Sequence, residues 1–100
     1  MSRKYVVVIS ERADNNLKRI FDYLELNWSV KVKNDFKKDL EKEVEYIREN
    51  PYIFPVSTVK DNVRRCVITK HNAMYYRISG NVVEIITIQD TRSKPSSLIL

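Results

Sequence analysis

The spacing of apolar residues changes along the N-terminal half of the chain from that of a strand to that of a helix. Lys4–Ile9 is short and rich in β-branched residues, which predicts a first strand. From Glu11 onward the apolar positions recur every three or four residues, as on one face of a helix. Ser10 stands where it can cap that helix, because its hydroxyl can accept a hydrogen bond from an early backbone N–H. The apolar stripe consists of Ala13, Leu17, Ile20, Phe21, Leu24 and Trp28.

A second amphipathic segment follows a short interruption at Asn27-Trp28-Ser29. Ser29 is its candidate cap, and Asn50-Pro51 ends it because the residue before a proline avoids the helical conformation. The short connection predicts an antiparallel helical hairpin, with Trp28 as an apolar plug that closes the tip. The apolar face of the second helix consists of Val32, Phe36, Leu40, Val44 and Ile47.

The C-terminal half reads as a loop over Pro51–Asp61 followed by three strands, Val63–Thr69, Ala73–Ile78 and Val82–Ile88. The breaks between these strands are short and rich in turn residues, which predicts consecutive antiparallel hairpins. The last strand is apolar on both faces for most of its length, as is typical of a central strand.

The predicted order of elements is β-α-α-β-β-β. This order favours an α+β fold in which a helical hairpin packs on one face of an antiparallel sheet of about four strands. A chain of 100 residues is long enough for one domain, so we expect a single domain over residues 1–100. The other face of the sheet is left for function.

Several classes of protein are excluded by composition. No apolar run approaches the roughly 18–20 residues that span a bilayer, and the N-terminus lacks the apolar core of a signal peptide. We therefore expect a cytoplasmic protein without a membrane partner. Cys66 and His71 are the only cysteine and histidine, and Gly80 is the only glycine, so neither a metal centre nor a phosphate-binding loop is expected, and no cofactor. Cys66 is interpreted as a buried, inert thiol.

Positive charge is concentrated in the second half of the chain. The whole sequence carries 18 Lys+Arg against 13 Asp+Glu, a formal net charge of +5, and most of the excess lies after residue 55. Such a distribution indicates an acidic or polyanionic partner. Because side chains alternate along a strand, Arg64 and Arg65 are predicted to point to opposite faces. The candidate target-binding residues are Arg64, Arg65, Lys70, Arg77, Arg92 and Lys94.

The chain resembles the RelE/ParE superfamily of bacterial type II toxin–antitoxin systems, many of whose members are labelled plasmid stabilisation proteins. The resemblance extends from about residue 4 to residue 98 and includes Trp28-Ser29 and Glu49-Asn50-Pro51 in the N-terminal half. It implies a small β-α-α-β-β-β toxin that a short antitoxin neutralises. The segments that carry it most clearly are Val63-Arg64-Arg65-Cys66-Val67-Ile68, Lys70-His71-Asn72, Tyr75-Tyr76-Arg77-Ile78 and Glu84-Ile85-Ile86-Thr87-Ile88-Gln89-Asp90-Thr91-Arg92.

The two branches of the superfamily imply different targets. The ParE branch poisons DNA gyrase, whereas the RelE branch cuts mRNA in the ribosomal decoding site. Ribonucleases of the RelE branch tend to carry cations and a proton-transferring side chain where this chain has Ile68, Ala73 and Leu98. These departures favour inhibition of gyrase.

Two further interpretations stay open at the level of sequence. In a ribosome-dependent endoribonuclease acting on mRNA, the catalytic residues would be Arg65, His71 and Arg92. A non-catalytic basic binding module or a degenerate toxin is the third possibility. For either kind of toxin we expect the antitoxin to cover exposed apolar surface near Leu17 and Phe21.

Overall fold

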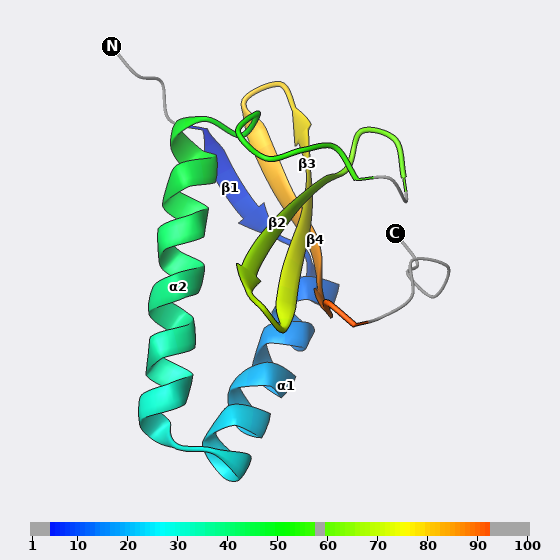
Figure 1. Cartoon of the computed structure of the whole chain (residues 1–100). Helices are drawn as coiled ribbons and strands as arrows, with labels where there is room; N and C mark the ends of the chain where they lie inside the picture. Colours follow the sequence, from blue (N-terminus) through cyan, green and yellow to red (C-terminus); the bar gives the residue numbers. More distant parts are fainter. Residues whose placement is uncertain (1–4, 58–59, 93–100) are drawn as a thin grey trace.

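Two helices separate the first strand from the other three, as predicted (Figure 1). The structure, a computed structural model, describes residues 5–57 and 60–92. Lys94 and Leu98, two positions singled out in the sequence, lie outside the described residues. The elements in order are β1 (Val6–Ile9), α1 (Glu11–Asn27), α2 (Val30–Glu49), β2 (Arg64–Thr69), β3 (Asn72–Ser79) and β4 (Val82–Asp90).

Both predicted helix caps are present. The hydroxyl of Ser10 accepts a hydrogen bond from the backbone N–H of Ala13 at 3.0 Å, and that of Ser29 accepts one from Val32 at 3.1 Å. Each bond satisfies one of the backbone donors that the first turn of a helix leaves free. Helix α2 ends at Glu49, immediately before the predicted Asn50-Pro51 boundary. The starts of both helices and the end of α2 are therefore defined by local sequence.

The four strands form one sheet in the order β1-β4-β3-β2. The β2–β3 and β3–β4 pairs are antiparallel, and β4 is central, as predicted. The expectation of a wholly antiparallel sheet is wrong at one pair, because β1 lies parallel to β4, with Val6 opposite Val82 and Ile9 opposite Ile85. Short turns dictate antiparallel pairing only between consecutive strands, whereas the long connection from β1 to β4 permits a parallel pair.

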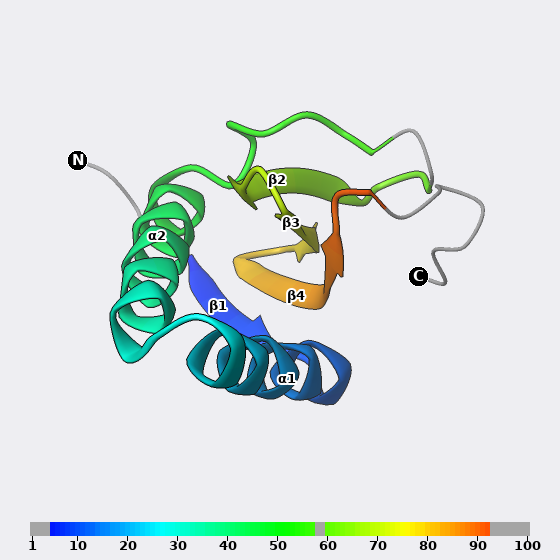
Figure 2. The same ribbon diagram turned by 60° about the horizontal axis from the view of Figure 1, so that its bottom comes forward.

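The helices cover one face of the twisted sheet, with α1 against β4 and α2 against β2 and β1 (Figures 1 and 2). A smaller cluster of Val63, Ala73 and Tyr75 lies outside this main core. The main core consists of Ala13, Phe36, Ile47, Cys66, Ile68, Met74, Tyr76, Val83, Ile85 and Ile88.

Trp28 does not close the hairpin tip. Its side chain is 68% exposed, so the prediction of an apolar plug is wrong. The tip projects beyond the end of the sheet (Figure 1), and Trp28 lines an open groove there instead of being enclosed. The interior of the hairpin is filled instead by Phe21 and Phe36, whose rings meet edge to face with centroids 6.0 Å apart.

Among residues 5–57 and 60–92, neither helix combines the length and the apolar character needed to cross a membrane. Within the same residues, no group of His, Cys, Asp and Glu side chains is arranged to hold a metal ion.

Candidate binding groove and basic surface

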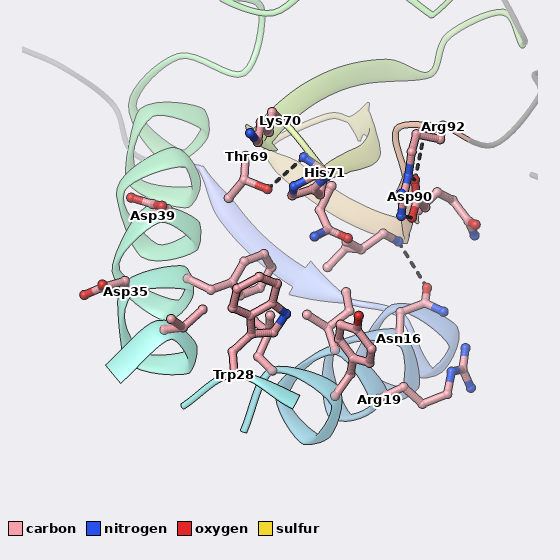
Figure 3. Close-up of a pocket in the computed structure, with 18 residues that line it drawn as sticks. Asn16, Arg19, Trp28, Asp35, Asp39, Thr69, Lys70, His71, Asp90 and Arg92 are labelled. Carbon is pink, nitrogen blue, oxygen red and sulfur yellow. Dashed lines mark hydrogen bonds and ion pairs between the residues drawn. The ribbon is translucent and has the colours of Figure 1, made fainter. Parts of the chain in front are cut away.

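A groove of about 980 Å³ lies between the helical hairpin and the end of the sheet that carries the β2–β3 turn (Figure 3). The two helices diverge from the Trp28–Ser29 turn, and the β2–β3 turn points towards the space between them (Figure 1). The floor of the groove is apolar, so it offers surface that water solvates poorly. Its apolar lining consists of Ile20, Leu24, Val32, Phe36 and Ile88.

Two aromatic side chains, one from the last turns of α1 and one directly after this helix, line the hairpin side of the groove. Tyr23 is 58% exposed and Trp28 is 68% exposed, which is unusual for side chains of this size. Exposed apolar residues gathered at one concave place, rather than scattered singly, mark a site of interaction. The groove therefore has the composition of a binding surface.

The acidic and basic residues that line the groove lie mostly on different walls. Asp35 and Asp39 belong to α2, and Lys31 forms an ion pair with Asp35 at 2.9 Å. The opposite walls contribute Arg19 from α1, Lys70 from the β2–β3 turn and Arg92 beyond β4. The α2 wall thus carries two acids, whereas the cations lie on the other walls, where Asp90 pairs with Arg92.

Arg92 is held by Asp90. The guanidinium donates two hydrogen bonds to the carboxylate, from Nη2 to Oδ2 at 2.7 Å and from Nε to Oδ1 at 3.0 Å. These bonds, with a third from the backbone N–H of Arg92, hold the pKa of Asp90 well below its usual range. The same contact raises the pKa of Arg92. Both groups are ionised at neutral pH, and the positive charge of Arg92 is matched by a fixed negative one.

His71 lies next to the Asp90–Arg92 ion pair, and nothing in the sequence indicated this proximity. The backbone C=O of His71 accepts a hydrogen bond from Thr91 at 2.9 Å, and both His71 and Arg92 line the groove. The hydroxyl of Thr69 accepts a hydrogen bond from the backbone N–H of His71 at 3.1 Å, which stabilises the β2–β3 turn. Two of the three residues of the ribonuclease hypothesis are therefore neighbours, while Arg65 does not line the groove.

The other candidate cations lie elsewhere. On β2, Cys66 and Ile68 are buried in the main core, whereas Val67 is 46% exposed, so side chains alternate as predicted. That alternation places Arg65 on the face away from the helices, where its Nε donates to the hydroxyl of Tyr75 at 3.2 Å.

Arg64 and Arg77 are engaged within the protein. Arg64 donates from Nη1 to the backbone C=O of Phe54 at 2.6 Å, and its guanidinium lies 5.1 Å from the ring centroid of Tyr52. Arg77 forms an ion pair with Glu84 at 2.8 Å across the β3–β4 pair. Arg64 therefore anchors the loop that precedes β2, and Arg77 supports the sheet.

Cys66 is buried, as interpreted from the sequence. Burial raises the pKa of its thiol to about 12, and the negative charge of Glu43 adds to the effect. The thiol donates to Oε2 of Glu43 at 3.7 Å. A thiol that stays protonated in this way is a poor nucleophile, which leaves Cys66 without a chemical role.

Leu17 and Phe21 do not form the exposed surface that was expected. Both are partly buried and pack against the main core. The exposed apolar side chains of this region are instead Tyr23, Leu26, Trp28, Val30 and Val32. These residues surround the interruption between the apolar faces of the two predicted helices. That position in the sequence was the signal that could have located them. The assignment of Leu17 and Phe21 to an antitoxin stays a prediction.

A helical hairpin on one face of a four-stranded sheet is the fold of the RelE/ParE type. A family model described as "ParE toxin of type II toxin-antitoxin system, parDE" matches residues 7–95. The chain belongs to the ParE toxin family and is the toxin component of a type II toxin–antitoxin system. The family implies a cognate antitoxin as its partner.

One curated relative and two solved structures agree with this membership. Toxin ParE1 of Caulobacter vibrioides is 33% identical over 81 residues, which is 80% of this chain and 82% of the relative. A structure described as the chromosomal ParDE TA system from P. aeruginosa superposes with a TM-score of 0.73 at 14% identity, over 87% of this chain and 96% of that one. The solution structure of a conserved hypothetical protein of Helicobacter pylori, HP0894, superposes with a TM-score of 0.53 at 10% identity, over 87% of this chain and 94% of that one. The two structures support the fold.

Proposed function

We propose that this toxin inhibits DNA gyrase in the cytoplasm, and that it does so by binding rather than by catalysis. Gyrase inhibition is the usual activity of the ParE family. The observation that carries the proposal is the Asp90–Arg92 ion pair, because it occupies the cation that a ribonuclease mechanism would need.

Cleavage of a phosphodiester requires positive charge fixed where negative charge develops, together with a group that transfers a proton. His71 is the only histidine of the chain and lies beside Arg92 in the groove. However, the ionised carboxylate of Asp90 offsets the charge of Arg92 and would repel an approaching phosphate. The reduced net charge beside His71 therefore supports inhibition by binding over cleavage of RNA.

The positions at which the ribonuclease branch tends to carry cations support the same conclusion. Ile68 is 8% exposed and Ala73 is 1% exposed. A cationic side chain at either position would be placed in an apolar cluster without a partner, at a cost of several kcal/mol. The burial of Ile68 and Ala73 therefore supports inhibition by binding over cleavage of RNA.

Inhibition by binding requires only a surface of suitable shape and charge. Two sets of residues are proposed to contact gyrase. Lys70 and Arg92 lie at the groove, and Arg65 and Arg77 lie on the sheet. Arg64 has a lesser part in this proposal, because the Phe54 carbonyl holds its side chain.

Two assays with the purified protein test the proposal. We expect inhibition when the toxin is added to gyrase and relaxed plasmid, and weaker inhibition by Arg92→Ala. Lys38→Ala, on the exposed face of α2, is the matched control and should inhibit like the wild type. Codon-dependent cleavage of mRNA on programmed ribosomes, lost in Arg92→Ala while supercoiling is untouched, would contradict the proposal and support the ribonuclease alternative.

A further inference from the structure

We infer that two copies of the chain pair through the free edge of β1, antiparallel to one another, and so join their sheets across a two-fold axis at Val8. This edge is separate from the groove, which is lined by the helices, the β2–β3 turn and the end of β4 but not by β1. The inference therefore does not depend on gyrase being the target.

The backbone groups of β1 alternate between β4 and the open side of the strand. The N–H groups of Val6 and Ser10 each donate at 2.9 Å to a carbonyl in or directly before β4. The N–H of Tyr5 points the other way, because it donates to a carbonyl in the last turn of α2 at 2.9 Å. By the same alternation, Val7 and Ile9 direct their N–H and C=O groups away from β4. Strand β1 is the end strand of the sheet, so within the described residues no strand lies on that side.

The two edge strands of the sheet are protected to different degrees. Strand β2 begins with two arginines, and the loop before it pairs with it through the Val56–Arg64 bridge. The N–H of Arg65 donates to Pro55 at 3.0 Å, and the β2–β3 register shifts between Val67 and Thr69. Charges, a covering segment and an irregular register are the usual means of preventing contact between sheet edges. Strand β1, which reads Val-Val-Val-Ile, contains no charge and no proline.

Apolar side chains at the same edge are exposed to solvent. Val7 packs against the main core, whereas its neighbours Val6 and Val8 are 50% and 42% exposed on the face away from the helices. Ile9 is 43% exposed at the end of the strand. Their burial would contribute free energy in addition to the backbone hydrogen bonds. The edge therefore offers both of the interactions by which one strand adds to another.

A second copy fits this edge because the edge is complementary to itself. With Val8 on the two-fold axis, Val7 of each copy lies opposite Ile9 of the other, and each such pair exchanges both of its backbone hydrogen bonds. The pairing ends at Tyr5, whose N–H is already bonded, and at Ser10, after which α1 begins. Because both copies use the same edge, the contact closes on itself and gives a dimer instead of a filament.

Charge at the two ends of β1 favours the antiparallel orientation. Glu11 is exposed directly after the strand, and Arg48 adjoins its beginning through the bond from Tyr5. Antiparallel pairing brings Glu11 of each copy towards Arg48 of the other, whereas parallel pairing would bring like charges together. The Nε of Arg48 donates to Glu45 at 3.1 Å, but a guanidinium has further N–H donors for a second carboxylate.

The dimer is expected to be weak. A contact made by one short strand from each copy falls below the roughly 1,200 Å² of a standard interface, and such contacts give complexes that depend on concentration. Each copy also carries a formal net charge of +5, so the copies repel one another until salt screens the charge. The dimer leaves both grooves uncovered, so it presents two binding surfaces to one partner and gains avidity.

Sedimentation equilibrium of the purified full-length toxin over about a hundredfold range of concentration, in about 0.3 M salt, tests the inference. We expect the average mass to rise from that of a monomer towards that of a dimer. Val8→Lys should weaken dimerisation at least about tenfold, because it places two like charges together at the axis. Val67→Lys is the matched control, since Val67 is 46% exposed on the opposite edge strand and adds the same charge. A monomer at every concentration, or equal effects of the two variants, would overturn the inference.

Exchange of backbone amide hydrogens tests whether the contact is a pairing of strands. At a concentration where the toxin is mostly dimeric, the amides of Val7 and Ile9 should exchange at least about fivefold more slowly than in the monomer. The amides of Val6 and Val8 face β4 in either state and should change less. Unchanged exchange at Val7 and Ile9 in a sample shown to be dimeric would mean that the copies meet elsewhere.

A charge swap tests the orientation. Glu11→Lys should weaken dimerisation, because it faces a cation of the second copy, and the double variant with Arg48→Glu should restore it. Far-UV circular dichroism of both variants confirms that they are folded. A double variant that dimerises no better than Glu11→Lys would contradict the antiparallel arrangement.

The cognate antitoxin is the other candidate for this edge. A toxin that is monomeric throughout, with Val7 and Ile9 protected only when antitoxin is present, would assign the edge to a strand of the antitoxin and overturn the inference. The target is tested separately. A toxin that dimerises as described but leaves gyrase active would contradict the proposed function and leave the dimer standing.

Discussion

The side-chain Oδ1 of Asn16 in α1 accepts a hydrogen bond from the backbone N–H of Ile88 in β4, at 3.1 Å. The same oxygen accepts the hydroxyl of Thr87 at 2.8 Å, and all three groups are buried. Strand β1 ends opposite Ile85, so beyond that point α1 takes the place of a strand along β4. Ser10 contributes similarly, since its hydroxyl donates to the backbone C=O of Ile86 at 2.7 Å. Polar side chains of α1 and of its N-cap residue thus complete the hydrogen bonding of the central strand.

Replacing Asn16 with Ala should destabilise the protein by about 1–3 kcal/mol, because it leaves the N–H of Ile88 buried without an acceptor. Urea unfolding at neutral pH measures the change. Asn15→Ala, exposed at the neighbouring position of the same helix, is the control and should shift the midpoint little. Equal midpoints for the two variants would show that the Asn16 bond contributes nothing.

Replacing Trp28 with Ala should change the free energy of unfolding by no more than about 0.5 kcal/mol, as expected for an exposed residue. Phe36→Ala, in the buried core of the same hairpin, should cost about 3–5 kcal/mol. The comparison is made by urea unfolding of both variants. A large cost for Trp28→Ala would restore the interpretation of this side chain as a plug.

Stability should fall at alkaline pH because of Cys66. The pKa of its thiol is about 12 in the folded protein and about 8.5 in an unfolded chain, so only the unfolded state ionises between these values. Stability from this group is complete below pH 8.5 and is lost as pH rises towards 12, by about 1.4 kcal/mol at pH 9.5. Burial also raises the pKa of Tyr76, which acts in the same direction at higher pH.

Unfolding in urea at pH 7 and at pH 9.5 measures this loss. Cys66→Ala should show a smaller decrease over the same range, whatever its stability at pH 7. An identical pH dependence in the variant would mean that the thiol ionises as readily in the folded protein as in the unfolded chain. Slow reaction of the wild-type thiol with iodoacetamide under native conditions is an independent expectation.

Arg92→Ala should weaken growth arrest on induction without reducing the amount of folded protein. Its ion pair with Asp90 joins two exposed side chains, and such pairs contribute little to stability. Growth curves and the soluble fraction of induced cells measure both effects. Full growth arrest by Arg92→Ala, or its loss from the soluble fraction, would contradict a direct part in toxicity.

Arg65→Ala should behave differently, which separates the two arginines. Arg65 donates to the hydroxyl of Tyr75, whose ring belongs to the small cluster on the face away from the helices. Its loss should cost about 0.5–1.5 kcal/mol, as for a typical hydrogen bond. Thermal unfolding of the purified variant measures it, and stability equal to that of Arg92→Ala would contradict the distinction.

The sequence predicted the features that depend on near neighbours. Ser10 and Ser29 cap the helices as expected, because a cap bonds to a backbone group three residues away. Phe36 and Ile47 are buried because helical spacing places them on the face turned to the sheet. The β2–β3 and β3–β4 pairs follow from their short turns.

The features that the sequence did not predict depend on distant parts of the chain. The exposure of Trp28 depends on how far the hairpin projects past the sheet, which apolar spacing alone does not determine. The approach of His71 to Arg92 follows from the pairing of Asn72 with Asp90 across two antiparallel strands. The groove is formed by the hairpin, a turn and the end of β4, and no single segment contains its pattern.

The position of β1 also governs how the chain folds. Ser10 and Ile86, which meet at the end of this strand, are 76 residues apart in sequence. Helices and hairpins form from near neighbours in microseconds, but a contact over such a separation must wait until a long loop closes. We therefore expect the hairpins of β2, β3 and β4 to assemble first and Val6–Ile9 to join them last. Until it does, an apolar strand is unpaired, which makes the newly made toxin most prone to aggregation before its sheet is complete.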